Sequence, residues 1–228
     1  WWQDYKDLID MYSEHIDLPE TIYDYFTEEV KSVKPENPHA EKYENPPIPI
    51  YTNNNTKSDL EKRFCYLFTP VTEGGGHAKI SLHAQEKSFK IGNATIIPIP
   101  MMHGHLQTCG WLIKESKADG TESSIAYLTD CNYISEDSIS LIHTNAPSLS
   151  HMIIDGLRIK PHSTHFSFDE AMQTAEKIGG KHIWFTHLTH ASSHNEVTQY
   201  IQDHLKKYPL LQKAESFLPA YDTLTIEC

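Results

Sequence analysis

Short apolar runs follow one another along most of the chain and predict strands. We expect strands at residues 47–51, 79–83, 88–91, 94–100, 109–114, 124–128, 152–155, 182–185 and 223–226. Apolar residues at helical spacing instead predict helices at residues 59–64, 137–143, 168–178 and 196–207. Because the early strands follow one another directly and the later strands alternate with helices, the pattern predicts a mixed α/β fold or a layered sandwich.

The first 46 residues differ in character from the rest. Residues 1–34 are acidic and aromatic, with apolar positions at helical spacing, and five prolines fall between residues 35 and 49. We expect residues 1–46 to form an acidic helical insertion or surface element. We expect residues 47–228 to be the C-terminal portion of a single domain.

Composition narrows the function classes. The formal net charge of -12 argues against a large polyanionic ligand, because proteins that grip nucleic acid usually present a basic face. The four cysteines are scattered without a CxxC pair, which favours neither a zinc finger nor a disulfide scaffold and suits a reducing compartment. No stretch is apolar for long enough to span a bilayer. These features predict a cytoplasmic protein without a membrane partner.

Chemistry-bearing residues stand where predicted strands end. They are His103 in PIPMMHGH, Asp130 in IAYLTDCN, His165 in KPHSTHFS and His187 in HIWFTHLTH. Strands fix backbone positions while the loops at their ends carry chemistry. Imidazole and carboxylate groups are ligands suited to zinc, manganese or iron. The pattern therefore predicts a metal site.

Each of these residues also has a structural interpretation. Asp130 could initiate a turn, and His103 could be an ordinary loop residue before a glycine. His162 and His165 could cap the helix that begins near Phe168.

Other polar residues near these motifs admit two interpretations. His190 and His194 could orient the metal ligands, or they could be solvated surface residues. Asp155 and Arg158 are predicted to form an ion pair that supports the structure.

Six motifs occur in a recognisable order. They are His103-Gly104 followed by GWLI, then YLTDCNYI, IIDGLR, HSTHFSFDEA, FTHLTH and LPAYDTLTI. This series resembles the metallo-β-lactamase superfamily, and most closely the branch with the cyclic phosphodiesterase of bacterial phosphonate breakdown. Ribonuclease Z is a more distant member. The resemblance extends from Pro47 to the end of the chain and implies an αββα sandwich with a dinuclear metal centre at one edge of its sheets.

The resemblance also implies roles for individual residues. His103 would bind one metal ion, Asp130 would bridge two, and His187 would bind the second. His165 matches the histidine that such phosphodiesterases use as a general acid. The remaining histidines of these motifs would orient ligands or contact substrate; they are His162, His190 and His194. The implied cofactors are two divalent ions, zinc or manganese.

Two departures from the family pattern stand out. The early HxHxDH motif, which supplies further metal ligands, is absent from this sequence together with the first strands of the sandwich. We expect an upstream segment of a longer protein to complete the site, since His103, Asp130 and His187 alone would hold at most one weakly bound metal. In addition, Thr223 stands where the family has a glycine after the aspartate of AYDG.

The sequence therefore favours a metal-dependent phosphodiesterase acting on a small or cyclic phosphodiester. A ribonuclease Z-like nuclease is the second hypothesis, and the acidic balance of the chain argues against it. A non-catalytic scaffold that lost the metal loop is the third. A thiol-ester hydrolase of the same superfamily stays open, because one fold serves several substrates. A homodimer is compatible with all of these.

Overall fold

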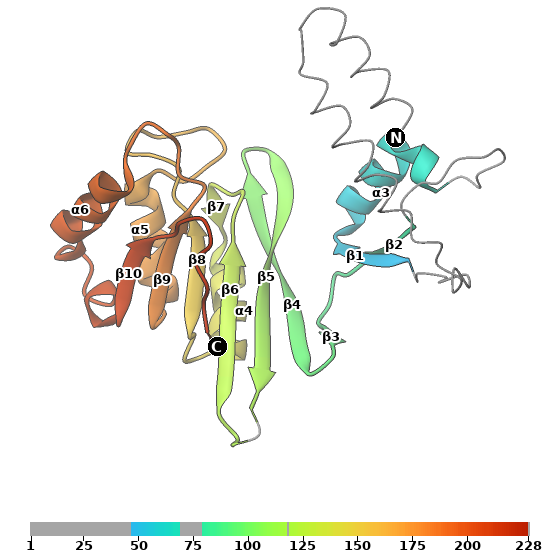
Figure 1. Cartoon of the computed structure of the whole chain (residues 1–228), viewed down its shortest axis with the longest axis horizontal. Helices are drawn as coiled ribbons and strands as arrows, with labels where there is room; N and C mark the ends of the chain where they lie inside the picture. Colours follow the sequence, from blue (N-terminus) through green and yellow to red (C-terminus); the bar gives the residue numbers. More distant parts are fainter. Residues whose placement is uncertain (1–46, 69–78, 118, 228) are drawn as a thin grey trace, which may run out of the picture. The chain divides into compact units, whose positions relative to one another are not determined.

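The computed structural model describes residues 47–68, 79–117 and 119–227. A mixed eight-stranded sheet dominates this part of the chain (Figure 1). Its strands are β3 (Phe89–Ile91), β4 (Ala94–His103), β5 (Leu106–Ser116), β6 (Glu122–Leu128), β7 (Tyr133–Ile134), β8 (His151–Asp155), β9 (His182–Thr186) and β10 (Ser216–Pro219). The strand order is β10-β9-β8-β6-β5-β4-β3, with β7 paired to β4.

Strand direction changes within this sheet. Strands β3 to β6 pair antiparallel, whereas β6, β8, β9 and β10 run parallel to one another. Since β4 and β6 are both antiparallel to β5, they also share a direction. The carboxyl ends of β4, β6, β8 and β9 therefore meet at one edge of the sheet. The predicted mixed α/β fold is confirmed.

A tight hairpin joins β4 to β5. His103 pairs with Leu106, so Gly104 and His105 form a two-residue turn. Gly104 has a φ of 63°, as the first central position of a type II′ hairpin turn requires. Both strands are longer than the sequence predicted, because this turn lets the ladder continue to His103.

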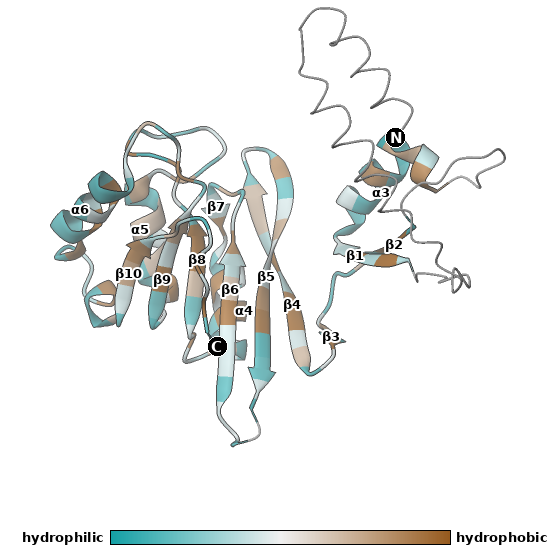
Figure 2. Cartoon of the chain, in the orientation of Figure 1, coloured by the Kyte–Doolittle hydropathy of each residue, from teal (hydrophilic) through white to brown (hydrophobic). Residues whose placement is uncertain are grey.

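Three amphipathic helices pack on this sheet. They are α4 (Glu136–Asn145), which contacts β4, α5 (Phe168–Ile178), which contacts β8, and α6 (His194–Leu205), which contacts β10. The side chains of Leu112, Met152 and Ile183 are fully buried between the sheet and these helices. Figure 2 shows brown bands on the strands and a largely teal α6, as expected for a sheet covered by amphipathic helices.

Helix starts follow local capping chemistry. Ser167 caps α5 and Ser193 caps α6, and each forms a capping box with the glutamate three residues later. The start of α6 lies two residues before the prediction because Ser193 was not recognised as its N-cap. Helix α5 has the bounds that the sequence predicts.

The beginning of the described chain forms smaller elements. Strand β1 (Ile48–Thr52) pairs in parallel with β2 (Ile80–Ala84), and α3 (Asn54–Arg63) follows β1. Short 3-10 helices lie at Cys65–Leu67 and Leu211–Lys213. The prediction for residues 1–46 falls outside the described residues.

The predicted strand at residues 223–226 is wrong. That stretch forms no strand, and the last strand is β10, seven residues earlier. A turn, closed by a hydrogen bond from Leu224 N to the Tyr221 carbonyl, interrupts it, and Thr223 has a φ of 70°. The β-branched residues at 223–226 favoured a strand, but a strand also needs a neighbouring strand to pair with. The last strand is therefore β10, which pairs with β9. Among the described residues, no helix has the length and apolar character needed to cross a bilayer.

Candidate metal centre

Four strand ends deliver polar side chains to one edge of the sheet. His103 is the last residue of β4, and Asp155 is the last residue of β8. Asp130 comes two residues after β6, and His187 comes directly after β9. The loop between β8 and α5 adds His165. The side chains that the sequence placed at separate strand ends thus gather at one edge.

Two of these residues have an unusual backbone conformation. Asp130 has a φ of 56° and His187 a φ of 61°, both in the left-handed region. Residues with a β-carbon rarely adopt this conformation, which costs of order 1–3 kcal/mol and is typical of functional sites. The conformation turns the backbone sharply at each of the two strand ends.

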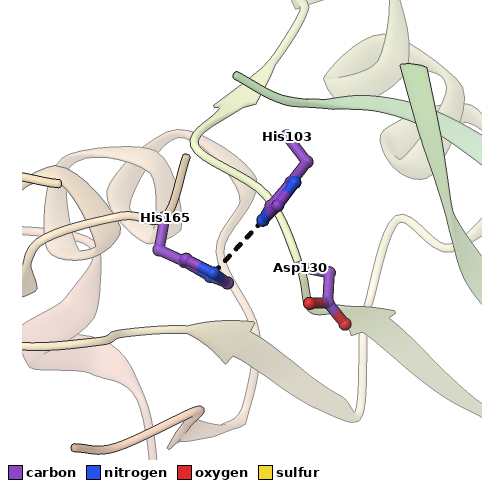
Figure 3. A group of neighbouring side chains, drawn as sticks. All are labelled: His103, Asp130 and His165. Atoms are coloured by element: carbon purple, nitrogen blue, oxygen red, sulfur yellow. Dashed lines mark hydrogen bonds between the residues drawn. The ribbon is translucent and has the colours of Figure 1, made fainter. Parts of the chain in front are cut away.

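His103, Asp130 and His165 form the centre of the cluster. One potential ligand atom from each lies within 4.8 Å of the others. The Nε2 atoms of His103 and His165 are 3.2 Å apart, and Figure 3 shows the two rings directed toward each other beside the Asp130 carboxylate. The cluster is open on one side, since Asp130 is exposed and the two histidines are half-buried.

A buried carboxylate orients His165. Nδ1 of His165 lies 2.7 Å from Oδ2 of Asp155, whose side chain is 0% exposed. Burial raises the pKa of Asp155, while hydrogen bonds from His165 and from the Cys131 backbone oppose that rise. An ionised Asp155 accepts from Nδ1–H and leaves Nε2 of His165 facing the cluster.

His187 completes the group and lies beside both Asp130 and His165. Its Nε2 lies 3.4 Å from Oδ1 of Asp130, and its ring centroid is 5.2 Å from that of His165. Its Nδ1 is 4.0 Å from Oδ2 of Asp155, beyond hydrogen-bond distance. His187 is therefore adjacent to the carboxylate that the resemblance makes the bridging ligand.

The donor set fits a divalent transition metal. Imidazole nitrogens and carboxylate oxygens bind zinc at about 2.0–2.2 Å, so two ligands of one ion lie at most about 4.4 Å apart. The separation of 3.2 Å between His103 and His165 satisfies that limit, and the full 4.8 Å span needs a small closure. Moreover, Oδ1 of Asp155 is buried and has no hydrogen-bond partner among the described residues. The residues thus offer part of a donor set that a divalent metal requires, and the open side of the cluster leaves room for further donors.

The remaining predicted residues lie outside the centre of the cluster. His162 is 5.3 Å from His165 between ring centroids, and its Nδ1 accepts a hydrogen bond from Thr164 N. His194 is the first residue of α6, and its Nε2 lies 3.0 Å from the Pro219 carbonyl oxygen. His190 is exposed in a turn. Of the three, only His162 lies beside the cluster.

Two structural interpretations from the sequence are wrong. Ser167 caps α5, so neither His162 nor His165 does. Arg158 donates to the carbonyls of Lys160 and Pro161 rather than to Asp155. The predicted ion pair between Asp155 and Arg158 does not form, because the Asp155 carboxylate is buried at the sheet edge and binds His165 instead.

Sequence reasoning missed the roles of Asp155 and Asn132. Asp155 ends the buried strand MIID, and a carboxylate at such a position signals a polar partner, since buried charges are rarely unpaired. Asn132 follows Asp130 by two residues and hydrogen-bonds two loops of the site. No local pattern distinguishes it from an ordinary turn asparagine.

Known proteins share this architecture. A diphosphatase from the PhnP family is similar in structure, with 28% identity and a TM-score of 0.58, over 79% of this chain and 58% of that chain. The metallo-beta-lactamase fold protein YhfI from Bacillus subtilis has 18% identity and a TM-score of 0.52, over 75% and 61%. The metallo hydrolase Igni18 from Ignicoccus hospitalis has 12% identity and a TM-score of 0.51, over 78% and 68%.

Sequence comparison agrees with the structural likeness. An octanoyltransferase of Porphyromonas gingivalis is 26% identical over 161 residues, which are 69% of this chain and 30% of that protein. This chain therefore spans less than a third of that relative and less than two thirds of the diphosphatase. The family model described as the beta-lactamase superfamily domain matches residues 33–188, which include the whole candidate metal centre. Because this match covers more than half of the chain, the protein belongs to the beta-lactamase superfamily.

Proposed function

We propose that this chain is part of a metal-dependent hydrolase, and specifically of a phosphodiesterase that acts on a small or cyclic phosphodiester. The observation that carries the proposal is the cluster of His103, Asp130 and His165 at the sheet edge. The hydrogen bond between His165 and the buried Asp155 carboxylate distinguishes this cluster from a chance gathering of surface histidines.

The similar diphosphatase supports phosphorus chemistry. That protein shares 28% identity with this chain, and its described activity breaks a phosphorus–oxygen bond. A diphosphate ester is therefore the second candidate substrate. Both substrate classes present anionic oxygens that a cationic centre would bind. The acidic charge of the whole chain favours a small substrate over a polymer.

The residues of the site have complementary tasks in this mechanism. His103, Asp130 and His187 would hold the two divalent ions together with further ligands. When bound, such ions supply a nucleophilic hydroxide at neutral pH and neutralise charge on the phosphate. His165 would hold a proton at Nε2 and donate it to the departing alkoxide. Asp155 would keep Nδ1–H of His165 fixed, so that Nε2 faces the leaving group.

His165 has a second role open to it. Its Nε2 is as well placed as that of His103 to bind a metal, because the two atoms are 3.2 Å apart. A general acid and a metal ligand respond differently to removal of the ring. As a general acid, His165 contributes about 10²–10⁴-fold to turnover and nothing to metal content.

His165→Ala separates these roles. We expect the purified full-length variant to retain its metal, measured by elemental analysis, and to lose at least about 100-fold in kcat with a small phosphodiester substrate. His143→Ala is the matched control, since His143 contacts the Ile178 carbonyl on the helical face and should leave both quantities unchanged. Loss of metal from His165→Ala would make His165 a ligand, and normal turnover would refute a catalytic role.

Metal content of the unmodified full-length protein tests the broader proposal. About two zinc or manganese ions per chain are expected for an assembled dinuclear centre. Less than about a tenth of an equivalent after reconstitution would contradict the hydrolase and favour the scaffold hypothesis. Salt-sensitive binding of transfer RNA would instead favour the nuclease hypothesis.

A further inference from the structure

We propose that Asn132 is a positioning residue of the metal centre, which sets the separation of His103 and His165 by joining the two loops that carry them. This inference rests on the proposed function and adds to it. Asn132 itself is not placed to bind the metal, because both ends of its side-chain amide are already hydrogen-bonded to backbone groups.

The amide of Asn132 contacts both loops at once. Its Oδ1 accepts a hydrogen bond of 2.8 Å from Gly104 N, at the tip of the β4–β5 hairpin. Its Nδ2 donates a hydrogen bond of 3.1 Å to the Ser163 carbonyl, two residues before His165. The two contacts also fix which end of the amide is which, since only oxygen can accept from a backbone N–H. One side chain thus bridges the residues beside His103 and His165.

The backbone of Asn132 is anchored as well. Asn132 N donates to the Met102 carbonyl, and the carbonyl of the preceding Cys131 accepts from Phe166 N. The segment that begins at the candidate ligand Asp130 is therefore tied to β4 on one side and to the start of α5 on the other. A movement of Asn132 would therefore displace His103, Asp130 and His165 together.

The two loops also approach each other closely. A β-carbon added to Gly104 would lie 2.9 Å from Cγ2 of Thr164 and 3.5 Å from the Ser163 carbonyl oxygen. Among the described residues, however, no backbone hydrogen bond joins the hairpin tip directly to residues 161–165. The direct polar contact between them is the 3.2 Å approach of the two imidazoles. That contact is a hydrogen bond when one of the two nitrogens carries a proton, and the Asn132 bridge is a second, independent link between the two loops.

This arrangement predicts a specific consequence for metal binding. Asn132 holds Gly104, which follows the candidate ligand His103, and it comes two residues after the candidate ligand Asp130. Residues that orient metal ligands typically change affinity by about 10–100-fold when they are removed. A merely structural asparagine would change stability without changing the separation of the two loops. The close contact between Gly104 and Thr164 gives a measure of that separation that needs no metal.

The test uses the full-length protein with Asn132→Ala, and Asn145→Ala as the matched control. Asn145 also donates one side-chain hydrogen bond, to the Leu141 carbonyl within α4, and it lies beside Thr95 at the amino end of β4, opposite the end that carries His103. The first measurement is the nuclear Overhauser effect between Gly104 Hα and the Thr164 methyl group in protein freed of metal. The second is the zinc dissociation constant by competition with a chelating dye.

We expect Asn132→Ala to lose the Gly104–Thr164 effect and to bind zinc about 10–100-fold more weakly, while Asn145→Ala retains both. Retention of the effect in Asn132→Ala would overturn the proposal, and so would zinc affinity within about twofold of the unmodified protein despite loss of the effect. If no variant binds zinc but the effect is lost only in Asn132→Ala, the positioning role stands and the proposed function fails.

A second variant guards against unfolding. Asn132→Asp keeps the acceptor for Gly104 N–H but replaces the donor to Ser163 with an oxygen that repels the carbonyl. The expected result is a folded protein in which the Gly104–Thr164 effect is lost. An unchanged effect in a folded Asn132→Asp protein would overturn the proposal.

Discussion

Strands β8 and β9 carry titratable residues at both of their ends, and the two ends differ in character. At the amino ends, His151 and His182 begin the strands and stack with ring centroids 4.9 Å apart. At the carboxyl ends, Asp155 and His187 join the candidate metal centre. Histidine rings also lie close together there, since His103 and His165 are 4.7 Å apart. Proximity of histidines alone therefore does not identify a functional site.

The ring nitrogens of the amino-end pair have local hydrogen-bond partners. Trp184 donates to Nδ1 of His151 over 3.4 Å, and the other side of that ring is hydrogen-bonded to the backbone of Glu227. Nδ1 of His182 lies 2.9 Å from the Ser216 hydroxyl, while the Glu215 carboxylate is 3.6 Å from its Nε2 and largely exposed. Both histidines lie in regular strands. Packing and local hydrogen bonds account for this pair.

The carboxyl-end group is different because one of its buried polar atoms has no hydrogen-bond partner among the described residues and its backbone is strained. A buried carboxylate holds His165, one of its oxygens has no hydrogen-bond partner among the described residues, and the backbone is left-handed at Asp130 and His187. Proteins retain such costs where function requires them. The orienting carboxylate and the backbone strain, rather than the histidines, distinguish the candidate centre.

The largest expected difference between the two ends is in turnover. Asp155→Asn removes the charge that holds Nδ1–H of His165, so kcat with a small phosphodiester should fall by about 10–100-fold while the metal content is retained. Ser216→Ala removes the hydroxyl beside His182 and should leave kcat within about twofold, since it lies outside the centre. Steady-state kinetics together with elemental analysis measures both. Equal losses in the two variants would show that the ends do not differ in function.

Stability should respond in opposite directions at the two ends. His187→Gly removes the strain of a left-handed residue and should raise the free energy of unfolding by about 0.5–1 kcal/mol in metal-free protein. His182→Gly places glycine in a regular strand and should lower it by about 1 kcal/mol. Urea denaturation of both variants makes the comparison. A destabilised His187→Gly would mean that contacts of the ring outweigh the backbone strain.

The smallest expected effect concerns pH and the amino-end pair. Burial, and then the nearby His182, lowers the pKa of His151 below its ordinary value of about 6.5. The unfolded chain therefore takes up a proton at higher pH than the folded chain. The stability that neutral His151 contributes is present above pH about 6.5 and is lost as the pH falls below it.

His151→Gln tests this dependence. Glutamine can accept from Trp184 and donate to the Glu227 backbone without titrating. The Tm of the variant should decrease less than that of the unmodified protein between pH 7.5 and 5.5. Glu215 and His182 face the same ring pair and remain in both proteins, so the difference isolates His151. Parallel Tm curves would contradict the assignment.

The sequence predicted the strands best where the signal was local. The β-branched run at residues 94–100 and the apolar run at 124–128 were placed correctly, and the helix at 168–178 has the predicted bounds. The strand at 223–226 was wrong, because a four-residue strand such as β10 depends on pairing with β9 rather than on its own composition. His103, Asp130 and His187 lie at strand ends or within two residues of one, as the sequence predicted, whereas His165 lies in the loop between β8 and α5. The catalytic and metal-binding roles of these residues remain predictions.

Two different kinds of information thus define the candidate centre. The sequence by itself determined which residue types stand at the strand ends, because strand periodicity and the motif order are local properties of the chain. Only the tertiary structure decided that Asp155 pairs with His165 rather than Arg158, and that Asn132 joins the loops of His103 and His165. These partners are separated by 10 to 31 residues, and their contacts depend on strand order and burial, which no local pattern encodes.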